Sequence, residues 1–359
     1  MPQTNYLSAE YDVLIVGGGI AGATLGAEIA GSARTLLIET EDLCGYHSTG
    51  RSAAFWLESY GGPIVAQLTA ASRPILKRGG FLRRRGALHV SPTRDFEVPE
   101  GVETREVTRE ELERRVPGIR PQWQHALMEP GCADIDVARL HSDALARYRR
   151  AGGELRTRSM LRAARFAAGR WSVELADGAT VTASILVNAA GAWADSVASA
   201  AGVQPLGIVP KRRTMVQLRV GRTGLRTLPL VSDAAGTFYF KGEGDRSIWL
   251  SPHDEIDSDP CDAAPEEIDV ATAIARFEQV VDWPVERVER SWAGLRSFAP
   301  DRIPVYGFAA DSPRFFWYAG QGGFGIQTAP AAARLAAALL LETYIDDEID
   351  WRPFAPSRF

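Results

Sequence analysis

Three glycines near the N-terminus, Gly17, Gly19 and Gly22, have the spacing of a turn that can hold a phosphate. Glycines let the backbone approach a pyrophosphate at the start of a helix, where free N–H groups and the helix dipole favour anions. Glu39 lies 20 residues beyond Gly19, and a carboxylate there can accept hydrogen bonds from both hydroxyls of a ribose. The pattern predicts a dinucleotide with an unphosphorylated ribose, bound by Gly17, Gly19, Ile20, Ala21, Gly22 and Glu39.

The segments around this turn have the composition of a nucleotide-binding β–α–β unit. Residues 11–16 form a short apolar run typical of a strand, residues 21–30 have helical composition, and residues 35–38 form a second strand. The glycine spacing alone is weak evidence, because it also occurs in turns without a ligand. The complete order of strand, turn, helix, strand and acid is much stronger evidence.

A small, polar segment at residues 45–54, GYHSTGRSAA, follows where a second β–α–β strand would lead to its helix. Its backbone can pass close to phosphates and to a flavin ring, whereas an NAD enzyme has no obvious need for it. We therefore expect a flavin dinucleotide, and the cofactor contacts expected here are Thr49, Gly50, Arg51, Ser52, Ala53 and Ala54.

Two later segments extend this prediction. Residues 185–193, ILVNAAGAW, are typical of a buried strand that ends in a turn of small residues, and residues 320–327 are glycine-rich and precede an Ala/Leu helix at residues 328–341. The start of that helix can stabilise negative charge on a reduced flavin. The sequence thus predicts noncovalent FAD, with further contacts from Ala190, Gly191, Trp193, Gly322, Gly323, Phe324, Gly325, Ile326 and Gln327.

Over nearly its whole length, the sequence resembles the D-amino-acid oxidase/dehydrogenase superfamily, the glutathione-reductase-like FAD amine oxidoreductases. The resemblance is closest to the bacterial D-arginine dehydrogenase type. The phrases that carry it, in order, are residues 45–54, 133–141 (ADIDVARLH), 186–193, 210–213 (PKRR), 238–241 (FYFK), 292–298 (WAGLRSF) and 321–328 (QGGFGIQT). The resemblance implies an FAD-dependent D-amino-acid dehydrogenase or oxidase.

An amino-acid substrate needs a cation for its carboxylate, and arginine supplies a bidentate one. The resemblance places Arg296 and Arg213 in the active site, with Arg296 as the main carboxylate clamp and Arg213 as its partner. A surface ion pair is the structural alternative for either arginine. The resemblance also places two tyrosines in the pocket, Tyr239 and Tyr60, although each hydroxyl could instead mark the rim of a packed core.

The Gly323 carbonyl could accept a hydrogen bond from the substrate amine. Hydride transfer from Cα needs only a neutral amine, so the sequence requires no general base. Solvent or His47 could take the ammonium proton, but we favour His47 as a contact of the cofactor or its loop.

The predicted side-chain pocket lacks the carboxylate that a basic substrate requires. Its expected strand, residues 85–89 (RGALH), carries no acid, and Phe55, Trp56 and Leu57 are large and apolar. Glu58 could still turn inward. We expect a preference for neutral apolar or aromatic side chains.

The chain has 359 residues, enough for two domains, and a net charge of −5, which offers no basic surface for nucleic acid. Basic runs at residues 83–85 and 211–213 are interpreted as solvated faces, apart from Arg213. Cys44, Cys132 and Cys261 are isolated and the five histidines are scattered, so no metal site is predicted.

Sparse cysteines favour a reducing compartment. Residues 13–16 are typical of a strand rather than a signal peptide. The apolar segment near the C-terminus contains Arg334 and is too short to cross a bilayer. We expect a cytoplasmic protein with no transmembrane segment, and peripheral association with the inner face of the membrane stays open.

From about residue 206 the sequence alternates polar and apolar residues, as an antiparallel sheet with one wet face does. The predicted fold class is α/β, a Rossmann-like FAD-binding domain with an inserted antiparallel-sheet substrate domain. The FAD-binding domain is expected at residues 1–80, 140–205 and 297–359, and the substrate domain at residues 81–139 and 206–296. Helices are expected at residues 67–76, 108–116, 136–150 and 265–281, and further strands at 85–90, 155–160, 171–175, 180–187, 214–220, 237–241, 247–251 and 287–292.

Two other functions remain as alternatives. One is a related flavin enzyme that oxidises an amine or a 2-hydroxy acid. The other is an FAD-binding structural or tRNA-modifying module, which fits less well because it should show a basic face. The expected partners are a small-molecule amino-acid substrate and an electron acceptor, which is a quinone, a dye-like molecule or oxygen.

Overall fold

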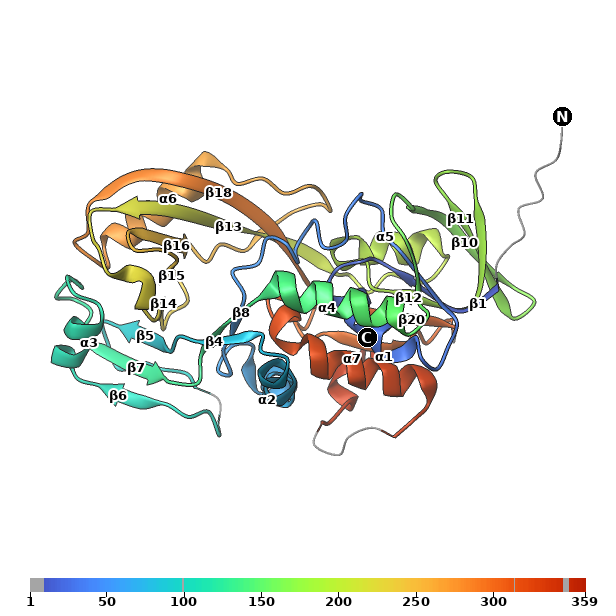
Figure 1. Ribbon diagram of the computed structural model, residues 1–359, viewed down its shortest axis with the longest axis horizontal. Coiled ribbons are helices and arrows are strands. Elements are labelled where there is room, and N and C mark those ends of the chain that lie inside the picture. The colour runs from blue at the N-terminus through green and yellow to red at the C-terminus, as the bar shows by residue number, and fades with distance from the viewer. Residues whose placement is uncertain (1–9, 99, 313, 345–348) are drawn as a thin grey trace.

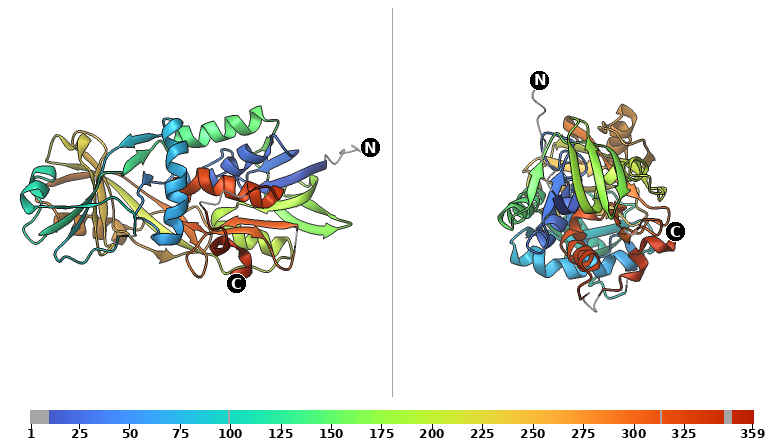
Figure 2. Two further views of the ribbon diagram at one scale, coloured as in Figure 1. Left: turned by 90° about the horizontal axis from the view of Figure 1, so that it is seen from below. Right: turned by 90° about the vertical axis from the view of Figure 1, so that its right-hand side faces the viewer.

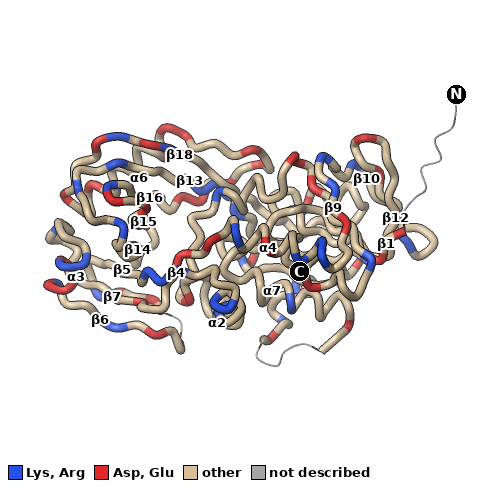
Figure 3. The backbone as a smooth tube through the Cα atoms, in the orientation of Figure 1, with Lys and Arg blue, Asp and Glu red and all other residues tan. Residues whose placement is uncertain are grey.

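The computed structural model describes residues 10–98, 100–312, 314–344 and 349–359. The molecule is elongated and has two bodies, one a sheet with helices packed on it and the other mainly antiparallel strands (Figure 1, Figure 2). Two long strands, β13 (Val209–Val220) and β18 (Val285–Phe298), run from the second body to the first. Positive and negative residues are interspersed over both bodies (Figure 3).

The first sheet is centred on β1 (Glu10–Val16), which has parallel neighbours on both sides. Its other strands are β2 (Thr35–Ile38), β9 (Glu154–Arg156), β10 (Leu161–Ala167), β11 (Arg170–Leu175), β12 (Thr180–Asn188), β19 (Val305–Phe308) and β20 (Phe315–Ala319). All residues of β2 and β20 are buried, as expected for parallel strands that are covered on both faces.

Both faces of this sheet are covered, because successive β1 side chains point to opposite faces and enter different cores. Val13 and Ile15 join the core that contains α1 (Ile20–Ile29) and α7 (Gly325–Leu341). Leu14 and Val16 join the core on the other face. The remaining helices of this body are α2 (Gly62–Arg78), α4 (Val137–Arg150) and α5 (Ala194–Ala200).

The second sheet has one face packed under helices and one face turned toward the site. Its strands, in spatial order, are β21 (Gln321–Gly322), β18, β13, β16 (Ser247–Ser251), β15 (Tyr239–Gly242), β14 (Leu230–Asp233), β5 (Ala87–Ser91), β7 (His125–Glu129) and β6 (Arg105–Val107), with β17 (Ile256–Asp257) beside β13. Leu88 and Phe240 pack with α3 (Arg109–Arg115) and α6 (Glu267–Glu278). Ala87, Tyr239 and Met215 share the opposite face. A small third sheet consists of β3 (Phe55–Trp56), β8 (Ala133–Ile135) and β4 (Leu82–Arg84).

The predicted fold class is confirmed, including the β–α–β unit at the N-terminus. The helix expected at residues 108–116 begins after Thr108, whose hydroxyl caps it by accepting a hydrogen bond from Glu111 N. Asp136 caps α4 in the same way. The domain limits stay a prediction.

Several elements differ in length from their predictions. β18 continues past residue 292 to Phe298, because it pairs with β13 along its length. β9 ends at Arg156 rather than at 160, and α7 begins at Gly325, inside the glycine-rich segment. The short strands β14, β19 and β20 were not predicted, since four or five residues carry little periodicity.

Candidate functional site

A cavity of about 440 Å³ lies between the first sheet and the ends of β13 and β18. It runs from the N-terminal glycine turn to Arg213, Tyr239 and Arg296. Three glycine-containing segments that are far apart in sequence line it, at residues 17–21, 189–193 and 321–326. One continuous space therefore joins the predicted nucleotide site to the predicted catalytic residues.

The N-terminal glycine turn is built for a close approach of backbone segments. Gly17 has φ of +108°, and a Cβ there would lie 2.5 Å from the carbonyl oxygen of Ala189. A Cβ on Gly22 would lie 2.0 Å from the Gly17 carbonyl oxygen. Only glycine fits these two positions, so their side-chain-free backbone is a packing requirement as well as a ligand feature.

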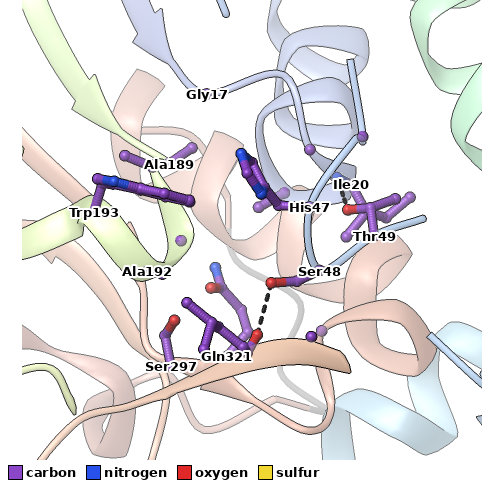
Figure 4. A pocket seen from close by; sticks show the side chains of 18 of the residues that line it. Gly17, Ile20, His47, Ser48, Thr49, Ala189, Ala192, Trp193, Ser297 and Gln321 are labelled. Carbon is purple, nitrogen blue, oxygen red and sulfur yellow. Dashed lines mark hydrogen bonds between the residues drawn. The ribbon is translucent and has the colours of Figure 1, made fainter. Parts of the chain in front are cut away.

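Two side chains already bind amides of this turn. Glu39 Oε2 accepts a hydrogen bond from Gly18 N at 2.8 Å, and its Oε1 accepts one from Glu41 N at 3.0 Å. The Thr49 hydroxyl accepts one from Ile20 N at 3.0 Å (Figure 4). Glu39 lines the cavity with a fixed carboxylate that retains acceptor capacity.

His47 lies at the nucleotide side of the cavity, beside Trp193 (Figure 4). The two ring centroids are 4.6 Å apart, and His47 Nε2 is 2.9 Å from Glu41 Oε1. Its Nδ1 is buried and has no hydrogen-bond partner within the described part of the chain. Trp193 is the last residue of a short 3₁₀ helix that begins at Gly191.

Arg213 and Arg296 are diagonal neighbours on one face of the β13–β18 pair. Arg213 lies opposite Gly294, and Arg296 lies opposite Lys211. Because side chains two residues apart share a face of a strand, the two guanidinium groups point to the same side. Gly294 lines the cavity, and the Arg51 side chain packs against it, since a Cβ on Gly294 would lie 3.2 Å from Arg51 Cβ.

The buried Arg213 is held by acceptors from one loop. Its Nε donates to the Asp254 carbonyl oxygen, and its Nη2 lies 3.3 Å from Glu255 Oε1. Its Nη1 is buried without a partner among the described residues. Burial and the positive charge of Arg296 lower the pKa of Arg213, although an arginine stays protonated in proteins.

The half-buried Arg296 is bound by Tyr60, whose hydroxyl lies 2.8 Å from Nη1. Gly323 lies against this pair, because a Cβ on it would be 2.5 Å from the Tyr60 hydroxyl and 2.9 Å from Arg296 Nη1. The Tyr239 hydroxyl lies 3.0 Å from Met215 Sδ, a weak acceptor.

A second cavity of about 230 Å³ opens from this place and shares Arg296, Tyr239 and Gly323 with the first. Its apolar walls include Phe55, Leu57, Leu230 and Phe238. Its polar groups are Ser59, His89, Glu97, Ser232, Asp233 and His253. The carboxylate of Asp233 accepts hydrogen bonds from Ala235 N and Thr237, and Glu97 is exposed.

Most of the predicted site residues line one of these cavities, but some do not. The Phe324 side chain packs with Tyr60, Val65 and Phe298 instead. Ala54 and Gln327 line only the second cavity, and neither Gly50 nor Gly22 lines either one. The Arg51 guanidinium binds Asp262 and the carbonyl oxygens of Ala263 and Ala293, so it ties the 45–54 segment to β18.

Sequence reasoning missed Met215, Ser297 and Gln321 in the first cavity and His89, Ser232 and His253 in the second. Ser297 and Gln321 lie inside phrases that carry the family resemblance, and His89 ends the expected pocket strand, but none was singled out as a site residue. No local motif distinguishes Met215, Ser232 and His253, which strand pairing and loop position bring to the site. Of these, His253 is kept neutral, since burial and the charges of Arg213 and Arg296 lower its pKa to about 4.

Residues 12–339 match the model of one protein family, the FAD dependent oxidoreductases. The chain belongs to this family. The cavity fits FAD in two respects: two buried polar atoms beside it, His47 Nδ1 and Arg213 Nη1, lack partners among the described residues, and Gly17 and Gly19 line it without side chains.

Curated relatives are distant. FAD-dependent oxidoreductase domain-containing protein 1 of Bos taurus is 29% identical over 204 residues, which cover 50% of this chain and 40% of that protein. Glycine oxidase of Pseudomonas aeruginosa is 26% identical over 256 residues, 70% of this chain and 68% of that protein. The match thus spans less than half the length of the bovine relative.

Solved structures share the fold along the whole chain. The L-proline dehydrogenase of P. horikoshii superposes with a TM-score of 0.84 at 21% identity and covers 98% of both chains. The glycine oxidase of Geobacillus kaustophilus has a TM-score of 0.82 at 20% identity and covers 98% of this chain and 99% of its own.

Cys44 is poorly suited to a covalent link, because burial and the Glu39 charge raise the pKa of its thiol to about 11. Among the described residues, no cluster of His, Cys, Asp and Glu could hold a metal ion. The same residues contain no helix that is both long and apolar enough to cross a bilayer.

Proposed function

We propose that this protein catalyses the FAD-dependent oxidative deamination of D-amino acids with neutral apolar or aromatic side chains. The observation that carries the proposal is the pair of guanidinium groups, Arg213 and Arg296, at the junction of the two cavities. Among the described residues Arg213 Nη1 has no hydrogen-bond partner, and Arg296 Nη1 is bound by the Tyr60 hydroxyl, so both guanidinium groups can still donate to an anion. A carboxylate matches the planar fork of an arginine.

The two cavities suit different ligands. The larger one extends from Glu39 to the arginines and suits noncovalent FAD, held by Gly17, Gly19, Thr49, His47 and the later glycine segments. The smaller one extends from the arginines into apolar walls and suits a substrate side chain. Glycine oxidase among the relatives supports an amino acid as substrate, and the D configuration comes from the sequence resemblance.

The residues at the junction would position the substrate. Arg296 and Tyr60 bind the carboxylate, with Arg213 Nη1 as a further donor, and the Gly323 carbonyl accepts a hydrogen bond from the amine. Bound FAD would supply the acceptor for the hydride that leaves Cα. The amine must first lose its ammonium proton, which solvent can take. The imine that leaves the site then reacts with water to give a 2-oxo acid and ammonia.

The second cavity does not favour D-arginine as the substrate, although the sequence resembles the D-arginine dehydrogenase type. A guanidinium side chain would need a free carboxylate. Ala87 faces the site from β5. Of the two acids that line the second cavity, Asp233 accepts hydrogen bonds from Ala235 N and Thr237, and Glu97 is exposed. A neutral side chain has no such requirement.

The deciding experiment is anaerobic mixing of the yellow protein with single substrates while the flavin absorbance is followed. D- and L-amino acids, secondary amines and 2-hydroxy acids form the panel. We expect bleaching by neutral D-amino acids. Bleaching only by amines, hydroxy acids or L-amino acids would overturn the proposal. Re-oxidation with oxygen or with a quinone then identifies the acceptor.

A further inference from the structure

His89, Ser232 and Tyr239 form one cross-strand row on the site face of the second sheet. Ser232 of β14 lies opposite His89 of β5 and opposite Tyr239 of β15. Residues in register on neighbouring strands point to the same face. All three side chains line the second cavity.

A buried carboxylate fixes the orientation of the His89 ring. Glu129 is 1% exposed. Its Oε1 accepts hydrogen bonds from the amides of Glu58 at 2.8 Å and Ser59 at 3.4 Å, and its Oε2 lies 3.1 Å from His89 Nε2. Burial raises the pKa of Glu129, but the hydrogen bonds from His89, Ser59 and Glu58 outweigh it and lower the pKa. An ionised carboxylate only accepts, so Nε2 carries the hydrogen.

The tautomer of His89 in turn orients the hydroxyl of Ser232. In the neutral imidazole, Nδ1 has no hydrogen and is an acceptor. Ser232 Oγ lies 3.1 Å from Nδ1, so its hydroxyl donates to a neutral His89. The oxygen lone pairs of Ser232 are then available to the cavity, where they can accept a hydrogen bond.

The position of Ser232 suits the end of a substrate side chain. Neighbouring strands are about 4.8 Å apart. Ser232 is on the strand next to that of Tyr239, and His89 is on the following strand, about twice as far from Tyr239 across the sheet. The apolar residues Phe55, Leu57 and Leu230 line the same cavity. An aromatic side chain whose carboxylate binds Arg296 would extend in this direction.

We propose that Ser232, oriented by His89 and Glu129, determines specificity by accepting a hydrogen bond from an O–H or N–H group at the far end of an aromatic D-amino-acid side chain. This inference rests on the proposed function and deepens it. D-Tyr and D-Phe are the sharpest probes, because they differ only in the hydroxyl group.

The test is the ratio of kcat/KM for D-Tyr to kcat/KM for D-Phe, measured with the FAD-loaded full-length protein. We expect a ratio of about 3 to 10 in the wild type, the range of one neutral hydrogen bond. Ser232→Ala should bring it to about 1 or below, and Ser232→Thr, which keeps the hydroxyl, should restore it. Ser247→Ala makes the same exchange on the same sheet outside both cavities and should keep the wild-type ratio.

The outcomes separate the two proposals. If D-Phe reduces the flavin but the wild-type ratio is 1 or less, Ser232 does not select a donor and this inference fails while the proposed function stands. The same holds if Ser232→Ala keeps the wild-type ratio. If no D-amino acid reduces the flavin, the proposed function fails and this inference fails with it.

Discussion

Nη1 of Arg296 donates a hydrogen bond to the hydroxyl of Tyr60 at 2.8 Å, across 236 residues of sequence. Because the phenol oxygen is the acceptor, its own hydrogen stays free to donate. Both groups can therefore present donors to one anion. Gln327 holds the loop that carries Tyr60, since it bonds to Leu57 N at 3.3 Å and to the Tyr60 carbonyl oxygen at 3.1 Å.

Arg296→Lys should lower kcat/KM for a D-amino acid about 10- to 100-fold, the cost of lost charge-assisted hydrogen bonds. Lysine keeps the charge but lacks the planar fork. The flavin spectrum should change little, and an amine without a carboxylate should lose much less activity. Arg219→Lys, on the same sheet outside both cavities, is the control. Equal losses for both substrates would show that Arg296 does not bind the carboxylate.

Gly323→Ala should lower kcat/KM about 10- to 100-fold, mainly through KM, because a new methyl group displaces the Tyr60–Arg296 pair. Steady-state kinetics with a neutral D-amino acid measures the effect. Gly31→Ala is the matched control, since a Cβ there meets no atom within 4 Å. Unchanged kinetics in Gly323→Ala would mean that the pair moves freely and does not depend on this glycine.

The local features of this fold could be predicted from sequence, because neighbouring residues determine them. The glycine turn needs a glycine at Gly22 for a steric reason within the motif, because a Cβ there would meet the Gly17 carbonyl oxygen. The caps at Thr108 and Asp136 are short-range hydrogen bonds. The family resemblance added Arg213, Arg296 and Tyr60, which no periodicity indicates.

The rest of the site depends on strand pairing over long sequence distances. The Glu129–His89–Ser232 chain needs β7, β5 and β14 side by side, and β14 has only four residues. The sequence also did not predict in which direction individual side chains of the glycine-rich phrase point. Phe324 lies within the glycine-rich phrase, yet its ring fills the core under Tyr60.

Glu39→Ala should weaken FAD retention more than it slows reduction of bound flavin. The carboxylate is predicted to bind a ribose, and the structure adds that it also holds the amide of Gly18. The expected loss is about 1.5–3 kcal/mol of FAD binding, measured by titrating the apoprotein. Glu28→Ala, further along α1 and paired with Arg147, should retain FAD normally. Wild-type affinity in Glu39→Ala would contradict this role.

The unfolding free energy should fall as the pH drops from about 6.5 to about 4, in part because of His253. Burial, followed by the charges of Arg213 and Arg296, lowers its folded-state pKa to about 4. The unfolded chain then takes up the proton first, so acid favours unfolding across this window. Replacing His253 by Gln should make the fall shallower by about 2 kcal/mol. Urea unfolding at several pH values checks this, and parallel curves for the two proteins would exclude the contribution of His253.

The preferred substrates should have neutral side chains, with kcat/KM for D-Phe, D-Leu or D-Met at least about tenfold above that for D-Arg. An apolar side chain gains about 25 cal/mol per Å² buried against Phe55, Leu57 and Leu230. A guanidinium loses water there without a free counter-ion, because Glu129 is already bound by His89 and backbone amides. Flavin reduction kinetics with each amino acid gives the ratio. A tenfold advantage for D-Arg would show that Glu58 turns inward, or that the exposed Glu97 of the second cavity pairs with the guanidinium, and Glu58→Gln and Glu97→Gln would then identify the acid.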